Sequence, residues 1–409
     1  ALCLVWGASP LWVWWVSGGH PVHVRADLTS AQRVYLEGVA RDTWRLFERC
    51  VIEQDHHLPP DNLQTSPHDM VAHRTSPTNI GLYLLSAACA RQFGWIGTEE
   101  LLARLDATLS TLHGLRRHRG HLMNWYDTQT AEPLLPMYVS TVDSGNLSGH
   151  LLAVAQACRE LADAPYDGQA AALAVAASAQ RLACEAAHAG EWLAGLPQQA
   201  AARKMIAMSD PLAQAARDLA AFESLLDQAD SEVVSALAVP DGAHAAAPDP
   251  SGHAQYHWLL ADHLACLRSA TRDRRAAARE QGQGQGQGYA KDDSPASRRL
   301  LDMAQALQDL AWAPDYRFLY HPTRRLFHIG YRVAEQQLDA GFYDLLASES
   351  RLTSLVAVAK GDVPVGHWSA LGRPFYALGA SVGLRSWAGS MFEYLMPRLV
   401  LREPPGSVL

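Results

Sequence analysis

The residues best suited to chemistry lie between positions 124 and 150, in the sequence NWYDTQTAEPLLPMYVSTVDSGNLSGH. Two aspartates, Asp127 and Asp143, stand there with the aromatic residues Trp125, Tyr126 and Tyr138. Aromatic faces stack on the C–H faces of pyranose rings, and carboxylates and amides bond sugar hydroxyls in a concave site. The stretch therefore predicts a carbohydrate site. The same residues also fit core aromatics with helix-capping aspartates, and the residue types alone leave both interpretations open.

A third acid, Glu349, lies in the sequence YDLLASESRLTSLVAVA. Helical spacing over 341–360 predicts an apolar stripe that includes Leu345 and Leu352, and it places Glu349 on the same stripe. A carboxyl group among apolar side chains is partly desolvated, which raises its pKa and suits a general acid. The alternative is an acid paired locally with a cation such as Arg351.

A fourth acid, Glu393, precedes a proline by four residues in SMFEYLMPRLVL. Because Pro397 lacks an N–H, it cannot bond the carbonyl of Glu393, and a break there would open the backbone beside the acid and near Trp387. The competing interpretation makes Ser390 a helix N-cap and Glu393 its capping-box partner. We slightly favour the capping box for the geometry of the acid.

Composition and spacing argue against several other functions. A net charge of −8 without a long basic run argues against nucleic-acid binding, which needs cations to neutralise phosphates. The six cysteines have neither CxxC nor CxxH spacing and no HExxH sequence is present, so we expect reduced thiols, no metal and no cofactor. The sequence GASVG matches a nucleophile elbow, but no histidine follows Ser381 to complete the triad.

The elements that must position these acids are predicted to be amphipathic helices, with a short hairpin at 320–333. The expected helices cover about 30–50, 78–93, 98–112, 146–162, 168–192, 209–238, 253–280, 296–312, 341–360 and 389–401. For the third of these, Thr98 is the expected cap, and Leu102, Leu105, Leu109 and Leu112 alternate three and four apart on one apolar face. The repeat QGQGQGQG at 281–288 predicts a flexible insertion. An α/α barrel fits this pattern, but periodicity alone does not separate it from a solenoid.

The first nineteen residues, ALCLVWGASPLWVWWVSGG, are apolar and uncharged. Their length and the tryptophans Trp12, Trp14 and Trp15 predict the end of a transmembrane helix with an interfacial aromatic belt. The alternative is a buried helix.

Eight blocks of sequence, in the same order, resemble the glycoamylase-like middle domain of cyclic β-1,2-glucan synthases. They are RTSPTNIGLYLLS, FGWIG, HRGHLMNWYDTQT, YVSTVDSGNLSGHL, FHIGY, YDLLASESRL, AKGDVP and SWAGSMFEYLMP. The resemblance spans about residues 28–405, and a related family of endo-β-1,2-glucanases shares this type of domain. It implies an all-α fold over 28–409, an α/α six-hairpin toroid (barrel) with short β hairpins in its loops.

In such synthases a membrane-embedded glycosyltransferase makes linear β-1,2-glucan, the middle domain cyclises it by retaining transglycosylation, and a phosphorylase-like domain trims chain length. The resemblance therefore implies a β-1,2-glucan chain and the other two domains of the same polypeptide as partners. It also implies a bacterial inner-membrane location, with the N-terminal segment in the membrane and the domain on the cytoplasmic side. A hydrolase and a non-catalytic glucan-binding module are the alternatives.

The resemblance also assigns roles to residues. Glu349, in the A-S-E-x-R-L block, looks like the general acid/base. Residues in blocks that resemble glucan-lining loops are assigned to substrate binding: Arg74, Tyr83, Trp125, Tyr126, Asp127, Asp143, Trp387 and Glu393. The family has a further glutamate block, W-G-I-S-E-S, after the segment that matches Pro404–Leu409. We therefore expect the nucleophile beyond this sequence and a barrel that is incomplete at its C-terminus.

Overall fold

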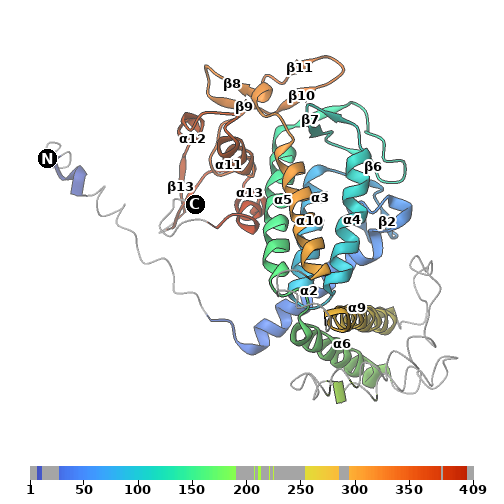
Figure 1. Cartoon of the computed structure of the whole chain (residues 1–409). Coiled ribbons are helices and arrows are strands. Elements are labelled where there is room, and N and C mark those ends of the chain that lie inside the picture. Colours follow the sequence, from blue (N-terminus) through green and yellow to red (C-terminus); the bar gives the residue numbers. More distant parts are fainter. Residues whose placement is uncertain are drawn as a thin grey trace.

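The computed structural model describes residues 7–11, 27–189, 207, 211–212, 221, 224, 254–284, 294–378 and 381–402. This part of the chain is mostly helical, with small antiparallel hairpins (Figure 1). The prediction of a helical protein with short hairpins in its loops is therefore confirmed. The complete six-hairpin toroid stays a prediction.

Four helices pack side by side at the centre of the described structure. They are α3 (Pro77–Gln92), α4 (Thr98–Gly114), α5 (Thr141–Ala162) and α10 (Pro295–Trp312) (Figure 1). The apolar stripe predicted for α4 is buried, and Leu105 and Leu112 are both 0% exposed. Replacing such a buried leucine with alanine lowers the free energy of unfolding by about 2–5 kcal/mol. The four helices therefore form a stable support for the loops at their ends.

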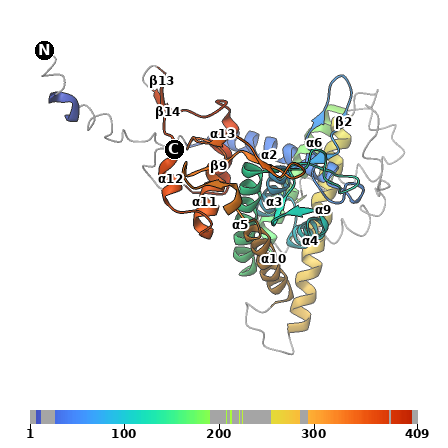
Figure 2. The same ribbon diagram turned by 90° about the horizontal axis from the view of Figure 1, so that it is seen from above.

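Three further helices pack around this core. They are α2 (Ser30–Cys50), α6 (Gly168–Ala189) and α9 (Ala254–Gly284). Helix α6 packs on α9, α9 packs on α4, and α2 packs on α3. A buried ion pair between Arg41 and Asp262, 2.6 Å apart, ties α2 to α9. Figure 2 shows α6 and α9 on the opposite side of α5 from the C-terminal elements.

The starts of α5 and α4 differ from the predicted ones. Helix α5 begins at Thr141 instead of 146, because Ser140 ends a strand and its hydroxyl accepts the N–H of Asp143. Thr98, the predicted cap of α4, is already helical. The N–H groups of Thr98 and Glu99 are bonded instead by Asp273 of α9, at 2.7 and 2.9 Å. A tertiary contact therefore replaces the local cap.

The hairpins join distant parts of the chain. Strand β3 (Arg74–Thr75) pairs with β6 (Tyr126–Asp127), and β7 (Tyr138–Ser140) pairs with β10 (Gly330–Arg332). Strand β9 (Leu326–His328) pairs with β8 (Tyr320–His321) and β12 (Phe342–Tyr343), which confirms the predicted hairpin near 320–333. The other strands are β1 (Leu63–Gln64), β2 (Met70–Val71), β4 (Arg117–His118), β5 (His121–Leu122), β11 (Gln337–Leu338), β13 (Phe375–Leu378) and β14 (Ser381–Leu384).

The helix predicted over 341–360 is wrong for its first ten residues. The backbone there is extended because Tyr343 pairs with Phe327 and Leu345 bridges Gly372, which also accepts the N–H of Leu346 at 2.9 Å. Helix α11 (Arg351–Lys360) begins only after this segment. The prediction that Glu349 lies on a helical apolar stripe is therefore wrong.

The chain beyond α11 folds against it (Figure 1). Two short helices follow, α12 (Gly366–Ala370) and α13 (Met391–Leu395), and a 3₁₀ turn, η7 (Met396–Leu399), continues α13. The predicted helix at 389–401 is thus shorter, and its α-helical part ends just before Pro397, as the missing N–H requires. The guanidinium of Arg351 donates to the carbonyls of Glu393 and Tyr394 at 3.3 and 3.0 Å and fastens α13 to α11.

Some predictions fall on residues outside the described ranges. Residues 1–6 and 12–19, most of the predicted end of a transmembrane helix, are among them, as are most of 209–238 and residues 285–288 of the predicted insertion. Residues 281–284 form the end of α9. Within the described ranges, no helix combines the length and the apolar character needed to cross a membrane.

Candidate functional site

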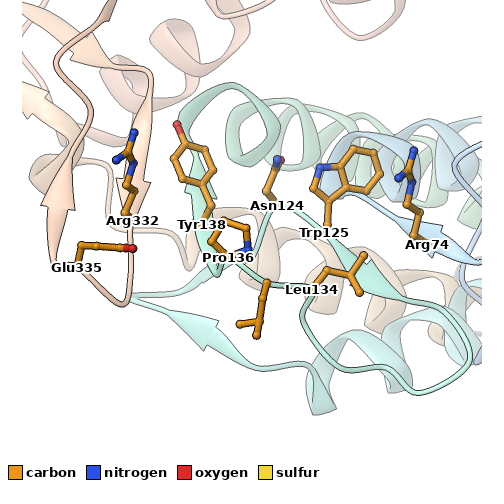
Figure 3. Close-up of a pocket in the computed structure, with 9 residues that line it drawn as sticks. Arg74, Asn124, Trp125, Leu134, Pro136, Tyr138, Arg332 and Glu335 are labelled. Carbon is orange, nitrogen blue, oxygen red and sulfur yellow. The ribbon is translucent and has the colours of Figure 1, made fainter.

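Two neighbouring cavities contain most of the predicted site residues. One, here called the acid cavity, has a volume of about 270 Å³ and is lined by Ile329, Tyr343, Ser348, Glu349, Trp387, Ala388, Ser390 and Glu393. The other, here called the aromatic cavity, has a volume of about 560 Å³ and is lined by Arg74, Asn124, Trp125, Leu134, Leu135, Pro136, Tyr138, Arg332 and Glu335 (Figure 3).

Glu349 lies in the turn before α11, half-buried in the acid cavity. Its Oε2 accepts a hydrogen bond from the Asn146 amide at 3.0 Å. Burial raises the pKa of Glu349; the Asn146 bond opposes this, and the negative charges of Asp143 and Glu393 add to it. A carboxyl group whose pKa is raised by desolvation suits a general acid. The desolvation of Glu349 expected from the sequence is present, although the residue lies in a turn and not on a helix.

Asp143 lies in the first turn of α5 and faces Glu349 through a shared network. Its Oδ1 accepts the hydroxyl proton of Thr78 at 2.5 Å. With the Asn124 amide oriented to satisfy both of its polar atoms, its nitrogen donates to Asp143 Oδ2 at 2.8 Å and its oxygen accepts from Trp125 Nε1 at 3.1 Å. Burial raises the pKa of Asp143 against these hydrogen bonds. Asp143 thus connects the two cavities.

Glu393 faces the acid cavity but serves as a structural anchor. The capping box with Ser390, favoured from the sequence, is present. The carboxylate also accepts from the backbone N–H groups of Trp387 at 3.0 Å and Ala388 at 3.1 Å. Burial would raise the pKa of Glu393, but the N–H groups of Ser390 and Ala388 outweigh it and hold the pKa below its usual range. This carboxylate is therefore ionised and fixes the loop that carries Trp387.

Two aromatic side chains form walls of the acid cavity. Trp387 is 51% exposed, and its ring meets Tyr343 edge-on at a centroid distance of 6.4 Å. Tyr343 was not predicted from the sequence, although it begins the same block as Glu349. Burial raises the pKa of Tyr343, and the charges of Asp143 and Glu349 add to the effect. The phenol therefore stays protonated and offers a donor to a hydroxylated ligand.

The aromatic cavity combines a flat ring with fixed charges. The Arg74 guanidinium lies 5.1 Å from the centroid of the Trp125 ring and bonds Asp61 at 2.8 and 3.1 Å. Figure 3 shows Tyr138, Asn124, Trp125 and Arg74 in a row, with Arg332 beside Tyr138 on the paired strand β10. Stacking surface beside charged and amide groups is the arrangement that the sequence predicted for a sugar site.

Two predicted tyrosines lie in the core and line neither cavity. Tyr83 is 1% exposed and packs against Phe47 at a centroid distance of 5.2 Å. Tyr126 is 0% exposed, and its hydroxyl donates to the carbonyl of Arg116 at 2.6 Å. The structure thus places both in core positions, the alternative that the sequence left open for Tyr126, and neither side chain is exposed to a ligand in either cavity.

The two aspartates of the 124–150 stretch have different roles. Asp127 Oδ1 accepts from the N–H groups of Gln129 and Thr130 at 2.9 and 2.8 Å, so it stabilises a turn and lines neither cavity. Asp143, by contrast, is joined to the wall of each cavity. No group of three or more His, Cys, Asp or Glu side chains able to hold a metal ion occurs among the described residues.

Comparison with known proteins identifies a homologous segment. The chain is 40% identical over 411 residues to cyclic beta-(1,2)-glucan synthase NdvB of Rhizobium meliloti (strain 1021), an alignment that covers 99% of this chain and 14% of that protein. The resemblance to cyclic β-1,2-glucan synthases is thereby confirmed as homology to one segment of such a synthase. No family model matches the chain.

Two solved structures show weaker likenesses. A putative glucoamylase from Bacteroides caccae ATCC 43185 is 11% identical, with a TM-score of 0.43 over 88% of this chain and 59% of that one. A putative glucoamylase from Bacteroides fragilis NCTC 9343 is 18% identical, with a TM-score of 0.28 over 33% of each chain. At these scores neither likeness supports a conclusion about the fold.

Proposed function

We propose that this chain is the cyclising segment of a β-1,2-glucan synthase, a transglycosylase in which Glu349 is the general acid/base. The observation that carries the proposal is the desolvated carboxyl of Glu349 in a cavity walled by Tyr343 and Trp387. It stands in a chain that is 40% identical to a segment of a cyclic glucan synthase. We extend the proposal to a bacterial inner-membrane location and to the glycosyltransferase and phosphorylase-like domains as partners.

The chemistry would be a retaining double displacement. Glu349 donates its proton to the glycosidic oxygen while the bond from that oxygen to C1 breaks, and a second carboxylate forms a glycosyl-enzyme. The ionised Glu349 then removes the proton from a 2-hydroxyl at the other end of the same glucan. The oxygen of that hydroxyl bonds C1 while the bond from C1 to the second carboxylate breaks, which frees the carboxylate and closes the ring. Cyclisation wins over hydrolysis when the acceptor sugar is well bound and water is poorly placed.

The nucleophile is assigned to neither carboxylate beside Glu349. Asp143 is bonded by Thr78 and Asn124, and Glu393 is bonded by the loop that it caps. Retention needs a second carboxyl about 5–5.5 Å from the acid.

The two cavities would hold successive sugars of the glucan chain. Trp125 and Trp387 offer ring faces for stacking, and Arg74 offers a polar group for hydroxyls. Asp143 would act through Asn124, which it bonds at the wall of the aromatic cavity. Glu393 would act by holding the Trp387 loop in place. These assignments extend the sequence prediction to the residues that the structure gathers at the cavities.

Product analysis of the full-length protein tests the proposal. Linear β-1,2-glucan is supplied to the wild type, to Glu349→Gln and to Glu160→Gln, a control on the exposed face of α5. We expect the wild type and the control to form a ring that is one water lighter than a linear chain of the same number of glucose units, together with the released linear fragment, and Glu349→Gln to form none. Cyclic product from Glu349→Gln would refute the role of this residue. Shorter linear products without any ring from the wild type would indicate a hydrolase, and binding without turnover would indicate a glucan-holding module.

A further inference from the structure

A chain of hydrogen bonds runs from Trp125 in the aromatic cavity toward the acid cavity, and its direction is fixed at the start. An indole N–H can only donate, so Asn124 must present its oxygen to Trp125. The Asn124 nitrogen therefore faces Asp143, which accepts at 2.8 Å. Asp143 thus accepts a hydrogen bond from the Asn124 nitrogen on the side of the aromatic cavity.

Thr78 continues the chain on the other side of Asp143. Its single hydroxyl hydrogen goes to Asp143 at 2.5 Å, so its oxygen is left to accept from Asn146 Nδ2 at 3.1 Å. The other hydrogen of Nδ2 goes to Glu349 Oε2 at 3.0 Å. The side chain of Asn146 is 0% exposed, and its Oδ1 has no hydrogen-bond partner in the described part of the chain. The Thr78 oxygen, which can only accept here, therefore turns the nitrogen end of the Asn146 amide toward Glu349.

We propose that Thr78 and Asn146 are positioning residues that keep the proton of Glu349 on Oε1, available for transfer to a bound sugar. An N–H donor at Oε2 makes that oxygen the acceptor of the protonated carboxyl group and leaves the proton on the other oxygen. A reversed amide would present Asn146 Oδ1, which would accept the proton in an internal hydrogen bond. The inference rests on the proposed role of Glu349 as general acid.

The charges around Glu349 determine the expected effect on pH dependence. Asp143 of α5 and Glu393 of α13 both raise the pKa of Glu349, whereas the Asn146 bond lowers it. Tyr343 of β12 faces the same group as a neutral phenol. Replacing Thr78 with valine keeps all three side chains, removes one hydrogen bond from Asp143 and frees the Asn146 amide to reverse. The pKa of Glu349 should then rise further.

The test compares pH–rate profiles of the full-length protein acting on linear β-1,2-glucan. We expect Thr78→Val to lower the rate at the optimum about tenfold, the effect of roughly one hydrogen bond, and to move the alkaline limb to higher pH. Thr78→Ser keeps the hydroxyl and should restore the limb and most of the rate. Thr108→Val should match the wild type, because this buried threonine bonds the carbonyl of His57, at 2.9 Å, outside the chain.

Each outcome of this comparison is decisive. A slower Thr78→Val enzyme with an unmoved alkaline limb would indicate a purely structural role and overturn the inference, as would an unchanged rate. Asn146→Ala removes the same donor from the other side, so it should show the same alkaline shift even where Thr78→Val does not fold. Wild-type turnover by Glu349→Gln would instead reject the proposed function, which separates the two failures.

Discussion

Replacing Glu393 with glutamine should loosen the loop that carries Trp387. The wild-type carboxylate accepts from the N–H groups of Trp387 and Ser390, at 3.0 and 3.1 Å, and from that of Ala388. Whichever way the new amide turns, one backbone N–H loses its acceptor: that of Trp387 if the nitrogen replaces Oε1, or that of Ser390 if it replaces Oε2. An unsatisfied buried donor costs about 1–3 kcal/mol, and the remaining bonds lose their charge assistance.

The combined loss is about 2–4 kcal/mol, which corresponds to local opening that is about 30- to 1,000-fold more frequent. Hydrogen exchange of the backbone amides at 386–390 should therefore accelerate by that factor. Because the pKa of Glu393 is lowered in the folded protein, its stabilising effect is present above the ordinary glutamate value of about 4.3 and is lost as the pH falls through the folded value. The difference between the variant and the wild type should thus be largest near neutral pH.

Glu160→Gln serves as the control for this measurement, because Glu160 lies on the exposed face of α5 and accepts from Gln156 one turn away. Exchange at 386–390 should be unchanged in this variant. Wild-type exchange rates in Glu393→Gln would refute the reasoning, since they would show that the carboxylate does not hold the loop.

Two further predictions concern the wall and the acid of the cavity. Trp387→Ala and Trp125→Ala should each weaken the binding of linear β-1,2-glucan about tenfold through lost stacking, whereas Tyr83→Phe should leave it unchanged. Calorimetric titration measures the affinity, and wild-type affinity in both tryptophan variants would reject the cavities as the glucan site. Glu349→Gln should raise the free energy of unfolding near pH 7. The raised pKa of Glu349 means that its ionisation destabilises the fold as the pH rises above about 4.3, so thermal unfolding of the variant and the wild type should converge below that pH.

Local features of the chain were predicted well from the sequence. The buried stripe of α4 follows from apolar residues three and four apart, and the Ser390–Glu393 capping box joins residues three apart. Both depend on contacts within one helix, which sequence spacing fixes directly. The sequence blocks also indicated the homologous segment of a glucan synthase, because 40% identity is spread over nearly the whole chain.

The surroundings of the acids were decided by contacts between distant residues. Glu349 stands in a turn because neighbouring backbone groups pair with Phe327 and Gly372. Its hydrogen-bond partner Asn146 is 203 positions away along the chain. Helical periodicity carries no information about such pairings.

The amino-acid sequence by itself therefore determined the helical architecture and the capping of α13, and it indicated Glu349 as the candidate general acid. Only the tertiary structure decided that Asp143 joins the two cavities while Asp127 stabilises a turn, and that Tyr83 lies in the core. The physical reason is that the pKa and the accessibility of a side chain depend on its desolvation and its hydrogen bonds, and the groups that provide these come from several elements brought together by folding.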